Sequence, residues 1–198
     1  GEFLYWRKTG EYFAYAKEII DVIRKASYLE DPSYTLKSIY DRAPFPYEEE
    51  IVNVKISDKE FKNYLLEDYD FNEDGEISSR EALAIEYIDL CSDNVSSLEG
   101  IEKFSSLKAL SVNGSSPGMG KLTAIDLSNN HKLEELSFLN NRVTNLNISG
   151  CKELKLIHCW ENKLTEIDLS SQTLLVELCC AQNFLKEIDI THCHNILN

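Results

Sequence analysis

The second half of this 198-residue chain repeats at a fixed interval, and this restricts its fold more than any other feature. The pattern Leu-x-x-Leu/Ile-x-Phe/Cys-x-x-Asn-x-Val/Leu begins at Leu133, Leu154 and Leu175, a step of 21 residues each time. An earlier copy begins at Leu107, and the longer interval after it contains a Gly- and Ser-rich loop at 113–121. Because one such repeat is too short to bury a core, successive copies must stack as coils of a solenoid.

Each repeat predicts one short strand. Leu136 and Phe138 alternate with polar residues, which places one face of the strand inside and pairs it in parallel with the next coil. A second apolar triplet, first seen at Leu122, Ile125 and Leu127, recurs at the same step. Four apolar columns and an Asn column identify a leucine-rich repeat. We therefore expect an α+β protein in which a helical region, residues 1–94, caps a right-handed solenoid of 21-residue coils, residues 95–198, with a short-stranded parallel sheet.

Two polar columns accompany the apolar ones. The amides of Asn141, Asn162 and Asn183 follow the strands and are expected to satisfy backbone groups that the turn leaves unpaired. A second column comprises Asp126, Asn147, Asp168 and Asp189, each followed two positions later by Ser or Thr. Aligned carboxylates could form a row of metal sites, but side chains that hydrogen-bond to their own turn explain this pattern more simply.

The six cysteines do not form the pattern of a disulfide-rich domain. Cys159 and Cys180 share an inward column and are expected to behave as small apolar residues, whereas Cys151 and Cys193 are two coils apart. Zinc-ligand types occur together at 158–159, 179–180 and 192–194, but strand alternation sends neighbouring members to opposite faces, so we expect no zinc site there. No nucleophile triad or Gly-rich phosphate loop is visible, and the sequence predicts a protein that is not an enzyme.

An acidic loop in the first half carries the pattern of a cation site. Residues 70–81 match Asp-x-Asn-x-Asp-Gly, five residues and Glu without a mismatch. We expect calcium to be held by side-chain oxygens of Asp70, Asn72 and Asp74, by the carbonyl of Glu76 and by both carboxylate oxygens of Glu81. Gly75 permits the sharp turn, and Ser78 would hold a bridging water.

Helices are expected on both sides of this EF-hand-like loop. Ser57 with Glu60 predicts a capping box that opens the first helix, and a second helix is expected from Ser79 through Ile88. Alternatively, Ser78 and Glu81 are simply the capping box of the second helix. A second loop of this kind is absent from residues 1–56, so calcium is expected to be structural and to fix the angle between the two helices.

Composition excludes several classes of partner. The net charge of −14 opposes binding to nucleic acid, which requires clustered Lys and Arg. No apolar run reaches the roughly 18 residues of a membrane-spanning helix. The sequence begins at Gly1 without Met, from which we expect that a leader has been removed. Residues 11–28 have the spacing of an amphipathic helix.

The run from Ile56 through the acidic loop, the segment Val95 to Leu107 and the 21-residue coils together resemble bacterial surface leucine-rich-repeat proteins. These are internalin-like proteins of the Bacteroides type, in which an EF-hand-like segment precedes the repeats. The resemblance covers about residues 51–198, and it implies an exported or lipid-anchored protein whose partner is a protein or a surface. It also implies Cys at the strand positions of Cys159 and Cys180.

The outward positions of the strands form the concave face of the predicted solenoid. The candidate binding residues on it are Leu139, Leu156, His158, Trp160, Glu135 and Glu177. Leu139, Leu156 and Trp160 need not be apolar for the coil, so they either anchor a protein or glycan partner or are covered by the loop at 113–121. We expect a non-enzymatic binding or adhesion module. An architectural spacer that presents a further domain is the alternative, and a hydrolase or redox protein is a third hypothesis.

Overall fold

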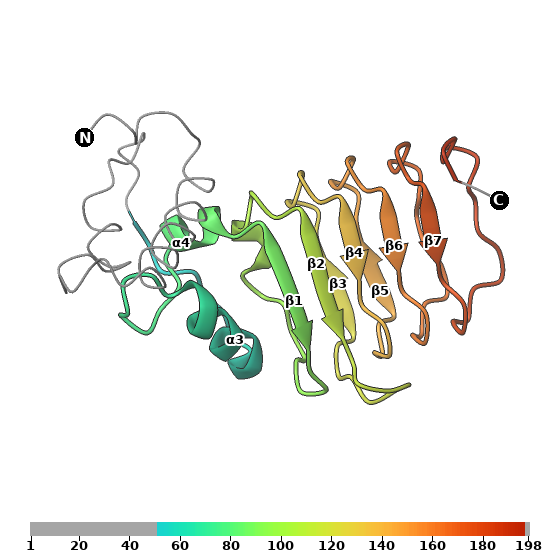
Figure 1. Cartoon of the computed structure of the whole chain (residues 1–198). Coiled ribbons are helices and arrows are strands. Elements are labelled where there is room, and N and C mark those ends of the chain that lie inside the picture. Colours follow the sequence, from blue (N-terminus) through green and yellow to red (C-terminus); the bar gives the residue numbers. More distant parts are fainter. Residues whose placement is uncertain (1–50, 197–198) are drawn as a thin grey trace, which may run out of the picture.

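The computed structural model describes residues 51–196, so the helix expected at 11–28 lies outside the described part. The described chain is an elongated stack of coils with a helical segment at one end (Figure 1). Its helices and strands are α3 (Lys59–Tyr69), α4 (Ser79–Ala84), β1 (Tyr87–Cys91), the 3-10 helix η1 (Ile101–Lys103), β2 (Ala109–Asn113), β3 (Ala124–Asp126), β4 (Glu135–Ser137), β5 (Asn145–Asn147), β6 (Leu156–His158) and β7 (Glu177–Cys179).

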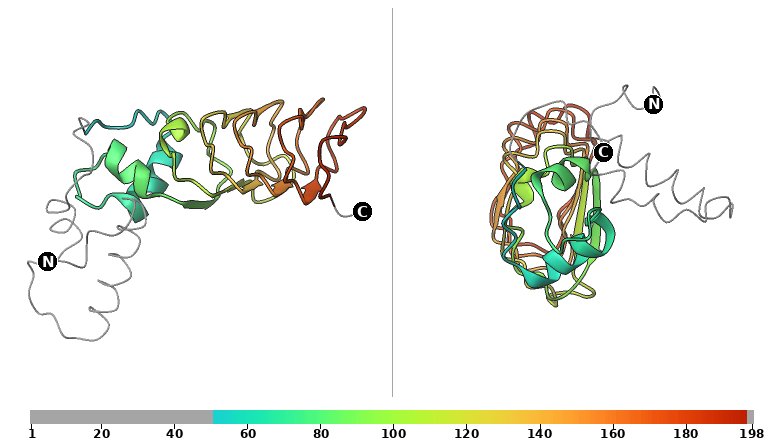
Figure 2. Two further views of the ribbon diagram at one scale, coloured as in Figure 1. Left: turned by 90° about the horizontal axis from the view of Figure 1, so that it is seen from above. Right: turned by 90° about the vertical axis from the view of Figure 1, so that its left-hand side faces the viewer.

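The coils stack in register. A parallel five-stranded sheet runs β1-β2-β4-β6-β7, and β3 pairs with β5 in a second, two-stranded sheet. Leu136 pairs with Ile157, which pairs with Leu178, and the first two are buried. Seen end-on, successive coils superpose around a common interior (Figure 2). The prediction of a parallel-sheet solenoid is therefore confirmed.

The sheet begins earlier than expected. Ile88 lies in strand β1 and not in a helix, because α4 ends at Ala84 and residues 87–91 pair along their whole length with β2. The expected helix through Ile88 was therefore wrong. Ile85, Ile88 and Leu90 have the spacing of Leu107, Leu110 and Val112, but the three-residue step from 85 to 88 also fits a helix face. Pairing with the strand of the next coil decides between strand and helix. A short segment of sequence does not reveal that pairing.

The Asn column joins neighbouring coils. The Nδ2 of Asn162 donates to the carbonyl of Phe138 in the preceding coil at 2.8 Å and to those of Cys159 and Trp160 in its own coil at 3.2 Å each. Its Oδ1 accepts from the backbone N–H of Val143 at 3.0 Å. Asn141 and Asn183 repeat this arrangement. The predicted structural role is confirmed, and the amides also bridge coils.

The residue before each of these asparagines has left-handed backbone. Asn140, Glu161 and Gln182 have φ of 59°, 55° and 56°. Non-glycine residues rarely adopt this conformation, since their Cβ crowds the backbone. The turn that leaves each strand therefore has the same shape in three successive coils.

Asp58 connects the helical segment to the solenoid. It is the N-cap of α3, accepting at one carboxylate oxygen from the N–H groups of Glu60 and Phe61 at 3.0 Å each. Its second oxygen accepts from the N–H and hydroxyl of Ser96, both at 2.8 Å, and from the N–H of Ser97 at 3.2 Å. The expected cap at Ser57 was therefore wrong by one residue.

Candidate functional site

The acidic loop folds around its own side chains. Asp70 accepts from the backbone N–H groups of Asp74 at 3.1 Å and Gly75 at 2.9 Å, and Asp74 accepts from that of Glu76 at 2.8 Å. Asn72 accepts from the N–H of Asp74 at 3.1 Å. Gly75 has the positive φ, 80°, that its position in the pattern requires. Oxygens of three side chains thus line one tight turn between α3 and α4.

Glu81 is buried and fully occupied by hydrogen bonds. One oxygen accepts from the N–H groups of Phe71 at 2.9 Å and Asn72 at 3.3 Å, and the other accepts from the N–H of Ser78 at 2.9 Å and its hydroxyl at 2.8 Å. These four donors use all of the roughly four lone-pair directions of a carboxylate. The capping box formed by Ser78 and Glu81 is therefore present. Burial raises the pKa of Glu81, and the four hydrogen bonds oppose that rise.

The outer face of the five-stranded sheet carries the predicted binding residues. Glu135, Leu156 and Glu177 form one row across β4, β6 and β7. His158 lies in the next row, and Trp160 follows β6 with 44% of its surface exposed. Leu139 and Leu156 are half-buried. The face therefore presents two exposed aromatic residues, Trp160 after β6 and Tyr87 on β1 with 58% exposure, together with partly covered aliphatic side chains.

Three polar side chains of this face meet at β6 and β7. His158 Nε2 lies 2.8 Å from Glu177 Oε1, and Cys179 Sγ lies 3.5 Å from the same oxygen. The hydrogen bond from His158, followed by that from Cys179, lowers the pKa of Glu177. Strand alternation argued against a zinc site, because it turns Cys159 and Cys180 away from their neighbours. It leaves His158 and Cys179 on the same outer face, however, and sequence reasoning did not combine these two with Glu177. The signal was available, since Glu177 and Cys179 are two residues apart on one strand.

The inward cysteines are wholly or partly shielded from solvent. Cys159 is fully buried in the column of Val112 and Phe138, and burial raises the pKa of its thiol to about 12. Cys180, next in this column, is partly buried. Burial also raises the pKa of Cys151 to about 12, and its thiol donates to the carbonyl of Leu127 at 3.1 Å. All six cysteines are free thiols in the structure.

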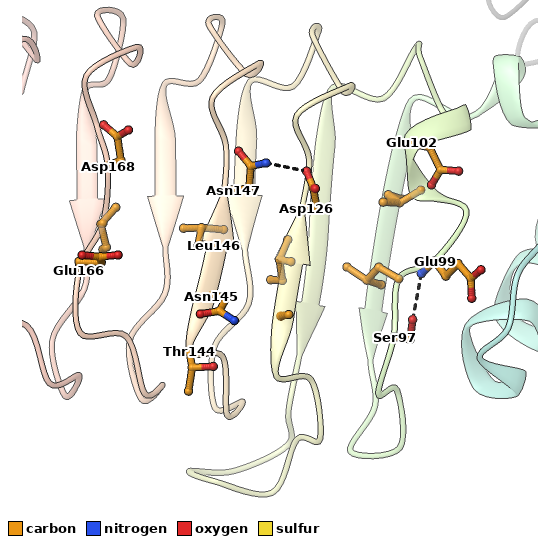
Figure 3. Close-up of a pocket in the computed structure, with 15 residues that line it drawn as sticks. Ser97, Glu99, Glu102, Asp126, Thr144, Asn145, Leu146, Asn147, Glu166 and Asp168 are labelled. Carbon is orange, nitrogen blue, oxygen red and sulfur yellow. Dashed lines mark hydrogen bonds between the residues drawn. The ribbon is translucent and has the colours of Figure 1, made fainter.

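The opposite side of the solenoid holds an acidic hollow of ≈ 890 Å³ along β3 and β5 (Figure 3). Its carboxylates are Glu99, Glu102, Asp126, Glu166 and Asp168, and none of the described residues lining it is Lys or Arg. Asp126 and Asp168 each accept from the backbone N–H two residues later at 3.0 Å, as do Asn147 at 3.3 Å and Asp189 at 2.9 Å. The turn interpretation of this column is confirmed.

Comparison with solved structures identifies the architecture. The functional domain of InlJ from Listeria monocytogenes, which includes a cysteine ladder, matches with a TM-score of 0.64 at 28% identity. The match covers 74% of this chain and 32% of that chain, so this chain spans about a third of that domain. The fold is an internalin-like leucine-rich repeat. Sequence comparison adds nothing further, because no family model and no curated protein matches this chain.

Two other Listeria monocytogenes internalins also match. Internalin C2 is 14% identical with a TM-score of 0.31, covering 71% of this chain and 90% of that chain. InlF is 18% identical with a TM-score of 0.30, covering 69% and 53%. Within residues 51–196, each helix is too short or too polar to cross a bilayer.

Proposed function

We propose that this chain is a non-enzymatic binding module at the cell surface that captures a protein or glycan on the outer face of its five-stranded sheet. The observation that supports this most directly is Trp160, a residue that is 44% exposed although the coil requires no aromatic residue there. Exposed tryptophan beside aliphatic side chains is typical of the energetic centre of interfaces. The internalin-like fold supports an exported location.

Variants of Trp160 test the site of docking. Fluorescently labelled protein would be applied to arrays of extracellular proteins and of glycans. Trp160→Ala should weaken binding to every positive spot by about ten-fold or more, because interface tryptophans commonly contribute at least 2 kcal/mol. Phe184→Ala is the matched control, since Phe184 is an aromatic residue with 65% exposure outside the sheet face. Equal affinity of wild type and Trp160→Ala would contradict docking at this face.

An architectural spacer is the second candidate. The last described coil exposes Phe184, Ile188 and Ile190. Ile190 stands in a column that the earlier coils bury, and the column of Ile188 is buried or partly buried in them. These apolar side chains favour stacking against a further coil or domain, as neighbouring repeats do in solenoids. A spacer would show no array binding that depends on Trp160, so the same experiment separates the two functions.

Calcium is the structural cofactor that we propose for the acidic loop. Asp70, Asn72 and Asp74 supply side-chain oxygens, Glu76 supplies its carbonyl, and oxygen is the ligand type that calcium requires. Glu81 would have to exchange some of its four hydrogen bonds for the ion. This exchange favours weak binding, with Kd on the order of 10⁻⁴ to 10⁻³ M.

The calcium proposal predicts a stability change that depends on Asp70. Calcium at about a hundred times Kd should stabilise the wild type by ~2.7 kcal/mol, measured by thermal denaturation with and without EGTA. Asp70→Ala should abolish this gain. Glu73→Gln is the control, since it removes a carboxylate from the same loop at a position that supplies no ligand in the pattern. A calcium-independent melting temperature in the wild type would overturn the proposal.

A further inference from the structure

The cluster on β6 and β7 has the composition of a transition-metal site. His158 Nε2, Glu177 Oε1 and Cys179 Sγ all lie within 4.8 Å of one another. His158 and Cys179 are direct partners across the parallel strands, and Glu177 precedes Cys179 by two residues on the same face. We propose that these three side chains bind one Zn²⁺ ion on the outer face of the sheet.

Two of the three separations can be compared with those of a tetrahedral site, and the third, from His158 to Cys179, is within 4.8 Å. Zinc bonds to nitrogen and oxygen are about 2.0–2.2 Å long and bonds to sulfur about 2.3 Å, so ligand atoms of a tetrahedron are roughly 3.3–3.8 Å apart. The 3.5 Å between Cys179 and Glu177 already falls in this range. The 2.8 Å between His158 and Glu177 is a hydrogen bond, which must open by about half an ångström to admit the ion between the two atoms.

The backbone holds the three ligands in place. Paired parallel strands lie about 4.8 Å apart, and residues two positions apart on a strand project to the same side. The row of His158 and Cys179 continues on β4 and β2, where its residues are Ser137 and Ser111. Those two strands therefore carry hydroxyl groups at the positions where β6 and β7 carry an imidazole and a thiol. The cluster is therefore a local feature of two coils and not a property of the repeat.

Ligand type selects the metal. Imidazole and thiolate favour zinc over calcium and magnesium, which prefer sets of oxygen atoms. Cys179 is an exposed thiol, and partial desolvation, followed by Glu177, raises its pKa, which favours the protonated form in the absence of metal. Binding of Zn²⁺ replaces that proton, which passes to solvent, and two positive charges then face the Glu177 carboxylate. Three protein ligands leave the fourth position open to water.

Cobalt(II) provides a spectroscopic test, because it replaces zinc in tetrahedral sites and its bond to a thiolate gives a charge-transfer absorption. The full chain would be titrated with CoCl₂ in excess calcium and a phosphine reductant, and ZnCl₂ would then be added. One equivalent of cobalt should produce the thiolate band and the visible bands of a tetrahedral ion, and zinc should remove both. Isothermal titration with ZnCl₂ gives the affinity and stoichiometry.

Three variants separate this site from adventitious binding. Cys179→Ser should abolish the thiolate band, and His158→Ala should weaken zinc binding by at least ten-fold, because loss of a group that merely orients a ligand already costs about 10- to 100-fold. Cys91→Ser is the control, since Cys91 is an exposed thiol on β1 of the same sheet. It should bind like the wild type.

Other results would overturn the proposal. These are the absence of the thiolate band in the wild type, its persistence in Cys179→Ser, or its loss in Cys91→Ser. A stoichiometry of one ion per two chains, with a dimer in gel filtration, would also overturn it because the site is built within one chain. The three side chains are on the surface, so unchanged thermal unfolding of each variant should verify that the fold is intact. The outcome is independent of the Trp160 experiment.

Discussion

The helical cap and the coils are stabilised in different ways. In the coils, the same contacts recur, as in the amides of Asn141, Asn162 and Asn183 that join successive turns. In the cap, single residues make contacts without a counterpart. Asp58 alone accepts five hydrogen bonds, two from α3 and three from Ser96 and Ser97 after β1. Glu81 closes the acidic loop with four.

This difference separates local from distributed stability. Because each coil contacts only its neighbours, the free energy of a solenoid is approximately a sum over coils and their interfaces. A substitution in one coil therefore removes one of several equivalent terms. A substitution at a unique residue of the cap can detach the whole segment from the stack.

The largest effect is expected for Asp58→Ala. It removes an N-cap, at about 1 kcal/mol, and leaves the N–H groups of Ser96 and Ser97 without their charged acceptor. We expect a loss of about 2–4 kcal/mol in urea-induced unfolding, with earlier hydrogen exchange in α3 than in β4. A loss shared equally by α3 and β4 would contradict the separation of cap from coils.

The contribution of the Asn column to stability is expected to decrease toward the last coil. Asn162→Ala removes four hydrogen bonds from a residue with 6% exposure, and about 2–3 kcal/mol should be lost. Asn183 makes the same contacts but is half-buried, so Asn183→Ala should lose about 1 kcal/mol. Urea denaturation of both variants measures the two losses of unfolding free energy. Equal losses would show that burial does not determine how much each asparagine contributes.

Acid should weaken the cap through Asp58. Burial pushes the pKa of this carboxyl upward, but hydrogen bonds from Phe61, Ser96 and Ser97 outweigh burial and hold it below the ordinary 3.8. A lowered pKa contributes stability that is present above pH 3.8 and is lost as the pH falls through the folded value. The stability difference between wild type and Asp58→Asn should therefore be constant near neutral pH and shrink below pH 3.8. A difference that grows in acid would contradict this assignment.

The smallest effect is expected at the repeated turns. Asp126 is exposed, and its bond to the N–H of Ser128 has counterparts in the neighbouring coils. Asp126→Ala should change the free energy of unfolding by no more than about 0.5 kcal/mol. A much larger loss, measured by the same denaturation, would show that the column carries more than local turn structure.

Periodicity made the coils predictable from sequence. Each inward position was supported by three or four equivalents, so the repeat alone was enough to place Phe138, Cys159 and the Asn column. Strand β1 was mistaken for helix because only one short copy of the pattern precedes Leu107, and its three-residue spacing suits both structures. Asp58 was missed because Ser57 and Glu60 also have the spacing of a capping box.

The candidate sites were predictable to different extents. The acidic loop follows from a contiguous pattern, but the four donors around Glu81 include backbone groups that no pattern reveals. The meeting of His158, Glu177 and Cys179 requires both strand alternation and side-chain rotamers. Strand alternation predicts that the three side chains lie on the same face of the sheet, whereas the distances between them depend on side-chain packing.

The left-handed turns at Asn140, Glu161 and Gln182 are positions where substitution can stabilise the protein. A non-glycine residue in this conformation costs about 1–2 kcal/mol, whereas glycine loses roughly 0.5–1 kcal/mol of chain entropy on folding. Replacing Glu161 and Gln182 by glycine would relieve backbone crowding where each chain segment leaves its strand. The heat tolerance of this scaffold could thus be raised at positions that belong to neither the sheet face nor the acidic hollow, so its surfaces would remain free for redesign.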